Sequence, residues 1–210
     1  VEKQDGLMRF TVGGCRVTVQ FWFMALVTLS LFLDRSGMAG IGLVAVILHE
    51  SGHLLMMSLV GTPPERLSMS LFGLEICQKS GSCRNYRQDA WIAAAGPLAS
   101  LFFFVLCWIG YELTRSLYLV NLAAANLMLA LLNGLPVGPL DGGQTLYALL
   151  CRKYPAETCE KIVEIVSFFV ILPTALAGFL VLLESRYNFS LLIVSGYLML
   201  MLLLKKGRYF

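Results

Sequence analysis

The chain has 210 residues, of which 58% are hydrophobic and only 14% are charged. A soluble globular protein carries about 25% charged residues, so this composition excludes an ordinary soluble domain and indicates several membrane spans. The formal net charge of +3 reflects Lys and Arg residues spread over polar loops and forms no basic patch. We therefore expect no nucleic-acid partner.

Six apolar segments follow one another along the chain, and each is expected to cross the lipid bilayer as a helix. They cover residues 17–33, 38–60, 90–110, 117–134, 162–183 and 189–204. A hydrocarbon core of about 30 Å needs about 20 helical residues, so the first, fourth and sixth segments either extend further or lie in thinned bilayer. The expected fold is an all-α polytopic membrane protein with about six transmembrane helices.

The positive charges predict which side of the membrane each loop faces. With six spans, 13 of the 16 Lys and Arg residues fall on one side, in the two terminal regions and the loops 61–89 and 135–161. Arg35, Arg115 and Arg186 are the three on the other side. Because cytoplasmic loops are rich in Lys and Arg, we expect a multi-pass protein of the cell membrane with both termini in the cytoplasm.

The 61–89 loop contains a pattern that is typical of short strands. Residues 67–71 alternate with a period of two, and residues 74–77 follow after Gly73, which predicts a short β-hairpin at the membrane surface. Residues 10–12 and 15–19 can add further strands. An exposed strand edge there could hold an extended substrate peptide by β-augmentation, and a plain surface hairpin is an equally good alternative.

The chain has two histidines, and they stand four residues apart in the second apolar segment, as His49-Glu50-Ser51-Gly52-His53. On a helix, positions i and i+4 share one face, so both imidazoles can bind one zinc ion while Glu50 acts as general base. The alternative is a pair of structural histidines that neighbouring carbonyls satisfy. Ionisable groups at membrane depth are costly and tend to be functional, which favours the metal site.

The depth of the two histidines follows from the expected orientation of the second span. If that helix begins on the outer side at Met38, a rise of about 1.5 Å per residue puts His49 and His53 roughly 16 and 22 Å below the outer face. A core about 30 Å thick then places the metal inside the membrane, nearer to the cytoplasm. The site is expected to open toward that side.

A catalytic zinc site needs a third protein ligand, and a carboxylate is the natural choice because no histidine remains. Asp141 follows the fourth span within residues 133–143, where prolines and glycines predict an irregular backbone that can bring it toward the histidines. An ordinary Asp-Gly turn is the alternative interpretation of Asp141. Glu164, near the cytoplasmic end of the fifth span, is the rival ligand.

Two motifs in combination resemble the site-2 protease family of intramembrane zinc metalloproteases. They are His49-Glu50-x-x-His53 in the second span and Asn133-x-x-Pro136-x-x-Pro139-Leu140-Asp141-Gly142 after the fourth. The compact six-span chain is most similar to the stage IV sporulation protein FB subgroup. The resemblance covers about half of the chain, from the second span to the loop that follows the fourth.

The resemblance implies a role for individual residues. Zinc would be held by His49, His53 and Asp141, Glu50 would be the general base, and Asn133 would contact the substrate or stabilise the reacting carbonyl. Residues 95–97, Ala-Gly-Pro, resemble a packing motif of the family. The asparagine that usually follows this motif is replaced by Ser100, so no catalytic role is expected at that position.

The activity that the resemblance implies is that of a zinc metalloendopeptidase in regulated intramembrane proteolysis. Its substrate would be a membrane-bound protein, cleaved within or next to a transmembrane segment. We expect residues 1–210 to form a single integral-membrane metalloprotease domain without a PDZ or CBS domain, so that regulation, if any, comes from other membrane proteins. The alternatives are a catalytically inactive relative that only binds membrane partners and a zinc transporter or sensor.

Overall fold

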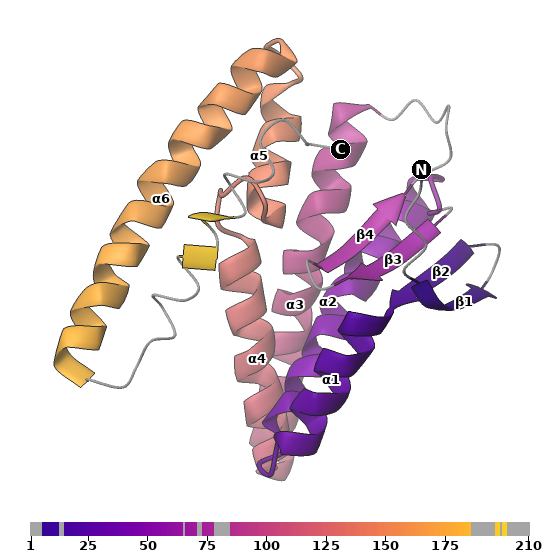
Figure 1. The fold of residues 1–210 in the computed structure, drawn as a ribbon, viewed down its shortest axis with the longest axis vertical. Coiled ribbons are helices and arrows are strands. Elements are labelled where there is room, and N and C mark those ends of the chain that lie inside the picture. The colour runs from indigo at the N-terminus through magenta and orange to yellow at the C-terminus, as the bar shows by residue number, and fades with distance from the viewer. Residues whose placement is uncertain are drawn as a thin grey trace. The chain divides into compact units, whose positions relative to one another are not determined.

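The computed structural model describes residues 6–12, 15–64, 66–70, 73–77, 85–185, 196–197 and 199–200. The described chain is mostly helical, and its elements are named along the chain as in Figure 1. They are β1 (Gly6–Val12), β2 (Cys15–Gln20), α1 (Phe21–Leu33), α2 (Met38–Leu59), β3 (Arg66–Ser70), β4 (Gly73–Cys77), α3 (Tyr86–Thr114), α4 (Leu117–Asn133), α5 (Asp141–Leu150) and α6 (Ala156–Ser185). The chain divides into two compact units, residues 1–84 with 99–127 and residues 85–98 with 128–210.

The first unit contains a four-stranded sheet in the order β1-β2-β3-β4, whose strands lie side by side in Figure 1. β1 pairs with β2 and β3 pairs with β4 in antiparallel fashion, whereas β2 and β3 run parallel. Val17 and Val19 are buried, while Arg16, directly before Val17, is exposed, as the period of two requires. The sheet thus joins two stretches of sequence that α1 and α2 separate.

The start of the first predicted span is wrong. Residues 17–20 belong to β2, which confirms the strand predicted at residues 15–19, and α1 begins only at Phe21. The reason is that Val17 and Val19 alternate with polar residues and pair with the neighbouring strands, so their hydrophobicity serves a sheet and not a helix. The remaining helix has 13 residues, none of them buried.

A tight turn between α1 and α2 sets the start of α2. The Asp34 carboxylate accepts hydrogen bonds from the backbone N–H of Ser36 at 2.9 Å and of Ala39 at 2.6 Å. The Ser36 hydroxyl also donates to it, at 2.6 Å, and this bond is the main reason why the pKa of Asp34 lies below its ordinary value. Gly37 has φ 76°, a conformation that glycine adopts without strain.

α2 has one buried stripe, and its other residues are half-buried or exposed. Its buried residues recur at helical spacing on one side and are Ala45, His49, Gly52, His53 and Met57. The opposite face exposes large apolar side chains such as Val44, Ile47 and Leu55. An exposed apolar face suits lipid and not water. By length and composition, α2 and α3 are the two helices of the described chain that could each cross a membrane.

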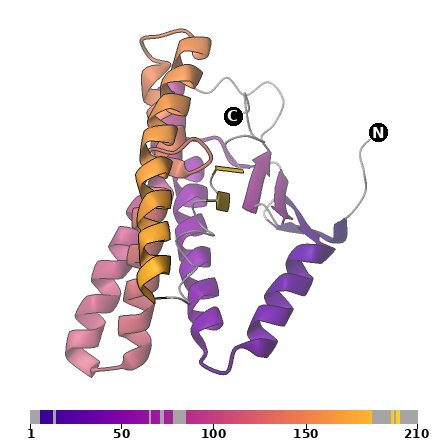
Figure 2. The ribbon, with the colours of Figure 1, turned by 60° about the vertical axis from the view of Figure 1, so that its left-hand side comes forward.

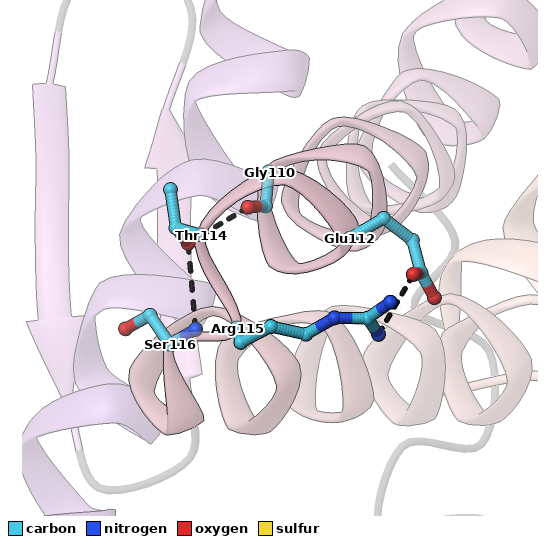
Figure 3. A network of polar contacts seen from close by, with 5 residues as sticks. All are labelled: Gly110, Glu112, Thr114, Arg115 and Ser116. Carbon is cyan, nitrogen blue, oxygen red and sulfur yellow. Dashed lines mark hydrogen bonds and ion pairs between the residues drawn. The ribbon is translucent and has the colours of Figure 1, made fainter.

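The connection from α3 to α4 is held by local polar contacts, which Figure 3 shows. The Thr114 hydroxyl donates to the Gly110 carbonyl oxygen at 2.8 Å and accepts the Ser116 backbone N–H at 3.4 Å. Arg115, with φ 55°, pairs with Glu112 at 2.8 Å. The Thr114 hydroxyl thus provides the acceptor for the backbone N–H of Ser116, which lies between the two helices.

The second unit is built around α5 and α6, which contact each other and lie side by side in Figures 1 and 2. One core cluster contains Tyr147 and Cys151 from the α5 end and Cys159 and Val163 from α6. A second cluster joins Val137, from the segment before α5, to Ile171 on α6. This packing connects the 134–140 segment to a long helix.

Other boundaries differ less from the sequence-based expectations. α3 runs four residues beyond the predicted segment 90–110 at each end, and α6 begins six residues before the segment 162–183 and ends two residues after it. Polar residues extend both helices past the apolar stretch. α5 was not predicted, since two glycines follow Asp141 and glycine disfavours a helix interior. The predicted segment 189–204 lies outside the described residues except for 196–197 and 199–200.

Candidate metal centre

His49 and His53 lie on the buried stripe of α2, in the first unit. Their side chains are 4% and 8% exposed, and their ring centroids are 5.1 Å apart at an interplanar angle of 75°. Regular helix geometry alone accounts for this pairing, because residues four apart are neighbours on the helix surface. Two imidazoles together in a buried apolar setting are a donor set that suits zinc.

The His49 ring has a buried partner on another helix of the same unit. Its Nδ1 lies 2.9 Å from the hydroxyl oxygen of Ser100 on α3, and Ser100 has no exposed surface. An imidazole that donates its Nδ1–H to a hydroxyl oxygen binds a metal ion through Nε2. Sequence reasoning placed Ser100 at the end of the motif that begins with residues 95–97 but did not predict its contact with His49.

Glu50 follows His49 directly on α2 and is half-buried. The motif assigns the general base to this position, and that role of Glu50 stays a prediction. The next residue, Ser51, is exposed, and its hydroxyl donates to the Leu48 carbonyl at 2.6 Å. Glu50 is therefore the ionisable neighbour of the two histidines on α2.

Asp141 lies in the second unit, as the first residue of α5, and is half-buried. A carboxylate is favourable there because the helix N-terminus carries partial positive charge. The residue before it, Leu140, has an extended backbone with φ −96° and ψ 162°. An irregular segment thus leads to Asp141, as the prolines and glycines predict, but it ends in a helix and not in a simple Asp-Gly turn.

The segment that leads to Asp141 is held in place by hydrogen bonds. Within it, the Leu140 N–H donates to the Val137 carbonyl at 2.8 Å. The Gly138 N–H donates to the Ser167 hydroxyl on α6 at 2.8 Å, and that hydroxyl donates in turn to the Val163 carbonyl at 2.6 Å. Ser167 therefore connects the segment to α6, and sequence reasoning missed it as well.

The two glycines after Asp141 allow the start of α5 to approach this segment closely. A Cβ atom on Gly142 would collide with the carbonyl oxygens of Gly134 and Leu135, and one on Gly143 with the backbone of Val137 and Gly138. Backbone atoms cannot move aside as flexible side chains do. Glycine is required at both positions for the contact between α5 and the segment.

The remaining predicted residues also lie in the second unit. Asn133 is the last residue of α4 and is half-buried, directly before the irregular segment. Glu164, the rival ligand, is half-buried on α6, next to the fully buried Val163. His49, Glu50 and His53 are therefore grouped on α2 in one unit, and Asn133, Asp141 and Glu164 belong to the other.

The chain matches no family model but has several similar proteins. It is 32% identical over 125 residues to the zinc metalloprotease MJ0392 of Methanocaldococcus jannaschii, which covers 53% of the chain and 33% of that protein. It is 25% identical over 126 residues to the stage IV sporulation protein FB of Bacillus subtilis, 57% of the chain and 42% of that protein. It is 29% identical over 152 residues to the putative zinc metalloprotease Rip3 of Mycobacterium tuberculosis, and this match covers 69% of the chain and 36% of that protein. The matches span less than half the length of each relative.

The fold is similar to that of a solved structure, the site-2 protease from Methanocaldococcus jannaschii. The TM-score is 0.68 at 23% sequence identity, over 96% of this chain and 95% of the other. The helical arrangement of this chain is therefore similar to the one in that structure. The resemblance to the site-2 protease family that the motifs predict is confirmed, by relatives in sequence and by this structure in fold.

Proposed function

We propose that the chain is an intramembrane zinc metalloprotease that hydrolyses a peptide bond within or next to a transmembrane segment of a membrane-bound protein. The observation that carries the proposal is the buried pair His49 and His53 on a helix of membrane-spanning length. A buried imidazole pair in such a helix has no evident packing purpose, since apolar side chains would cost less. The names of the relatives, zinc metalloproteases, support the same reaction.

The proposed zinc ligands are His49, His53 and Asp141, the residues that the two sequence motifs indicate. Two imidazoles and one carboxylate leave a fourth position open, which is the arrangement of catalytic zinc sites. A buried site of this composition favours zinc over calcium or magnesium, because those cations prefer oxygen ligands. Glu164 remains the rival for the third ligand.

The proposed mechanism divides the work between the metal and the side chains. Zinc, when bound, supplies a Lewis acid that polarises the scissile carbonyl and acidifies water. Glu50 takes the proton from the attacking water and delivers it to the leaving amine. Asn133 donates an amide hydrogen bond to the substrate or to the oxygen that gains negative charge at the scissile carbonyl, and hydrogen bonds to such developing charge lower the barrier.

The proposal includes the membrane arrangement. The chain crosses the bilayer six times as one integral-membrane domain, with both termini and the polar loops 61–89 and 135–161 in the cytoplasm, because 13 of its 16 basic residues then lie on that side. A reporter active only outside the cytoplasm should give signal when fused at Arg115 and none after Arg208. The opposite pattern would reverse the orientation and move the site to the other face.

The function is tested by expressing the chain together with a library of tagged single-span membrane proteins, with wild type and Glu50→Gln in parallel. Glu50→Gln preserves size but removes the base. Its cleavage rate should fall by about 10²–10⁴-fold, while zinc and bound substrate are retained. Equal rates in the two proteins would contradict the mechanism. A wild type that binds several membrane proteins and cleaves none would support the inactive relative instead.

A further inference from the structure

The buried contact between His49 and Ser100 has a consequence for the proposed zinc site. We propose that Ser100 is a positioning residue, whose hydroxyl oxygen accepts the Nδ1–H of His49 and holds the ring with Nε2 toward the metal. The inference rests on the proposed function, because it assumes that His49 is a ligand. It assigns a role to a position where the motif resemblance predicts none.

The contact has the geometry and burial that such a role needs. The Nδ1 to Oγ distance is 2.9 Å, and both side chains are shielded from water, with His49 4% and Ser100 0% exposed. A neutral imidazole has one N–H donor and one acceptor nitrogen. If Nε2 is to bind a metal through its lone pair, Nδ1 must carry the proton, and a buried N–H needs an acceptor.

The bond made by Ser100 differs from those of the other helical serines. Ser51 and Ser58 on α2 donate to carbonyl oxygens of their own helix, at 2.6 and 3.1 Å. This is the usual local bond of a helical serine. The Ser167 hydroxyl likewise serves backbone groups. Ser100 instead contacts the ring of a proposed ligand that lies 51 residues away in sequence.

A partner for the second ring nitrogen matters because it fixes both the tautomer and the ring orientation of a metal ligand. Loss of such a partner typically lowers metal affinity or activity by about 10–100-fold. In water, an imidazole without a partner can rotate or carry its proton on either nitrogen. Ser100 removes this freedom before the metal arrives, which is a form of preorganisation.

The experiment compares two variants of nearly equal shape at position 100. Ser100→Thr retains the hydroxyl, whereas Ser100→Val replaces it with a methyl group, so steric effects are the same in both. Zinc affinity is measured in purified protein by competition with a chelator. We expect Ser100→Val to bind zinc about 10–100-fold more weakly than Ser100→Thr. Cys107→Ala, a buried truncation seven residues along α3, is the control and should bind zinc as wild type does.

A second measurement reads the tautomer directly in metal-free protein. The chain has only two histidines, so the imidazole nitrogen signals in an NMR spectrum come from His49 and His53 alone. At a pH where both rings are neutral, His49 should be protonated at Nδ1 in wild type and in Ser100→Thr. In Ser100→Val a substantial fraction should carry the proton on Nε2, the form that water favours.

The outcomes separate this inference from the proposed function. A wild-type chain that binds no zinc would overturn both. A wild type that binds zinc, together with equal affinity and equal tautomers in Ser100→Thr and Ser100→Val, would overturn the role of Ser100 and leave the protease proposal intact. Parallel losses in the Thr and Val variants would also overturn it, because the hydroxyl would then not matter.

Discussion

α2 and the segment from Gly134 through α5 present their proposed ligands in different ways. On α2, His49 and His53 are one helical turn apart, so regular backbone bonds place both rings. Asp141 instead follows an irregular segment that depends on Ser167 of α6 and on the absence of side chains at Gly142 and Gly143. The first arrangement is local, and the second requires the packed structure of its unit. Damage to packing should therefore affect Asp141 before it affects the histidines.

The largest expected effect comes from removal of the ligands themselves. His49→Ala should abolish zinc binding, measured as loss of about one equivalent per chain by metal analysis, because two remaining ligands hold zinc poorly. Asp141→Ala should also lose zinc and activity, which would show that the tertiary ligand is as necessary as the local ones. Full zinc and full activity in Asp141→Ala would transfer the role to Glu164 or another group.

A substitution of glycine by alanine should lower the stability of the protein on α5 but not on α2. Gly143→Ala forces a Cβ atom against the Val137 backbone and should destabilise the protein by about 1–3 kcal/mol, with weaker zinc binding. Gly40→Ala on α2 is the matched control, since a Cβ there meets nothing within 4 Å, and it should be neutral or stabilising by up to about 1 kcal/mol. Thermal unfolding in detergent measures both. Equal effects would contradict the distinction between the two helices.

Substitution of two serines, Ser167 on α6 and Ser58 on α2, should have smaller effects on stability. Ser167→Ala removes the acceptor of the buried Gly138 N–H, which should cost about 1–3 kcal/mol and lower zinc affinity through Asp141. Ser58→Ala removes an exposed bond within α2 and should change stability by less than about 0.5 kcal/mol. Chelator competition measures the change in zinc affinity, and thermal unfolding measures the change in stability. Unchanged zinc affinity in Ser167→Ala would mean that the segment keeps its position without this bond.

The smallest expected effect is chemical and reports on the packing of α5 against α6. Burial, with a smaller effect of the neighbouring Cys159, raises the pKa of the Cys151 thiol to about 11, so little thiolate exists at neutral pH. Alkylation of Cys151, followed by peptide mass spectrometry, should be slow in wild type and should accelerate only as pH rises toward that value. In Gly143→Ala it should be faster at the same pH. Rapid alkylation of the wild type would show that this packing is loose.

Several features of the fold could be predicted because they depend on local pattern. The helices 38–60 and 117–134 match α2 and α4 within one residue, since an apolar run bounded by polar or glycine-containing turns has few other solutions. Strands are found where period-two alternation predicts them, at β3 and β4. For Val17 and Val19 the sequence offered both a strand over residues 15–19 and the start of the first span, and the structure shows the strand. Hydrophobicity alone does not distinguish a strand from a helix over so short a stretch.

The sequence by itself determined the chemistry of the proposed site. Two histidines and a glutamate follow one another on a regular helix, and only a few carboxylates can serve as the third zinc ligand. Tertiary structure decided which groups support that chemistry. Ser100 beside His49 and Ser167 beside Gly138 are contacts over 51 and 29 residues, and no periodicity encodes them. The physical reason is that a lone hydroxyl in an apolar helix carries no directional signal until packing provides its partner.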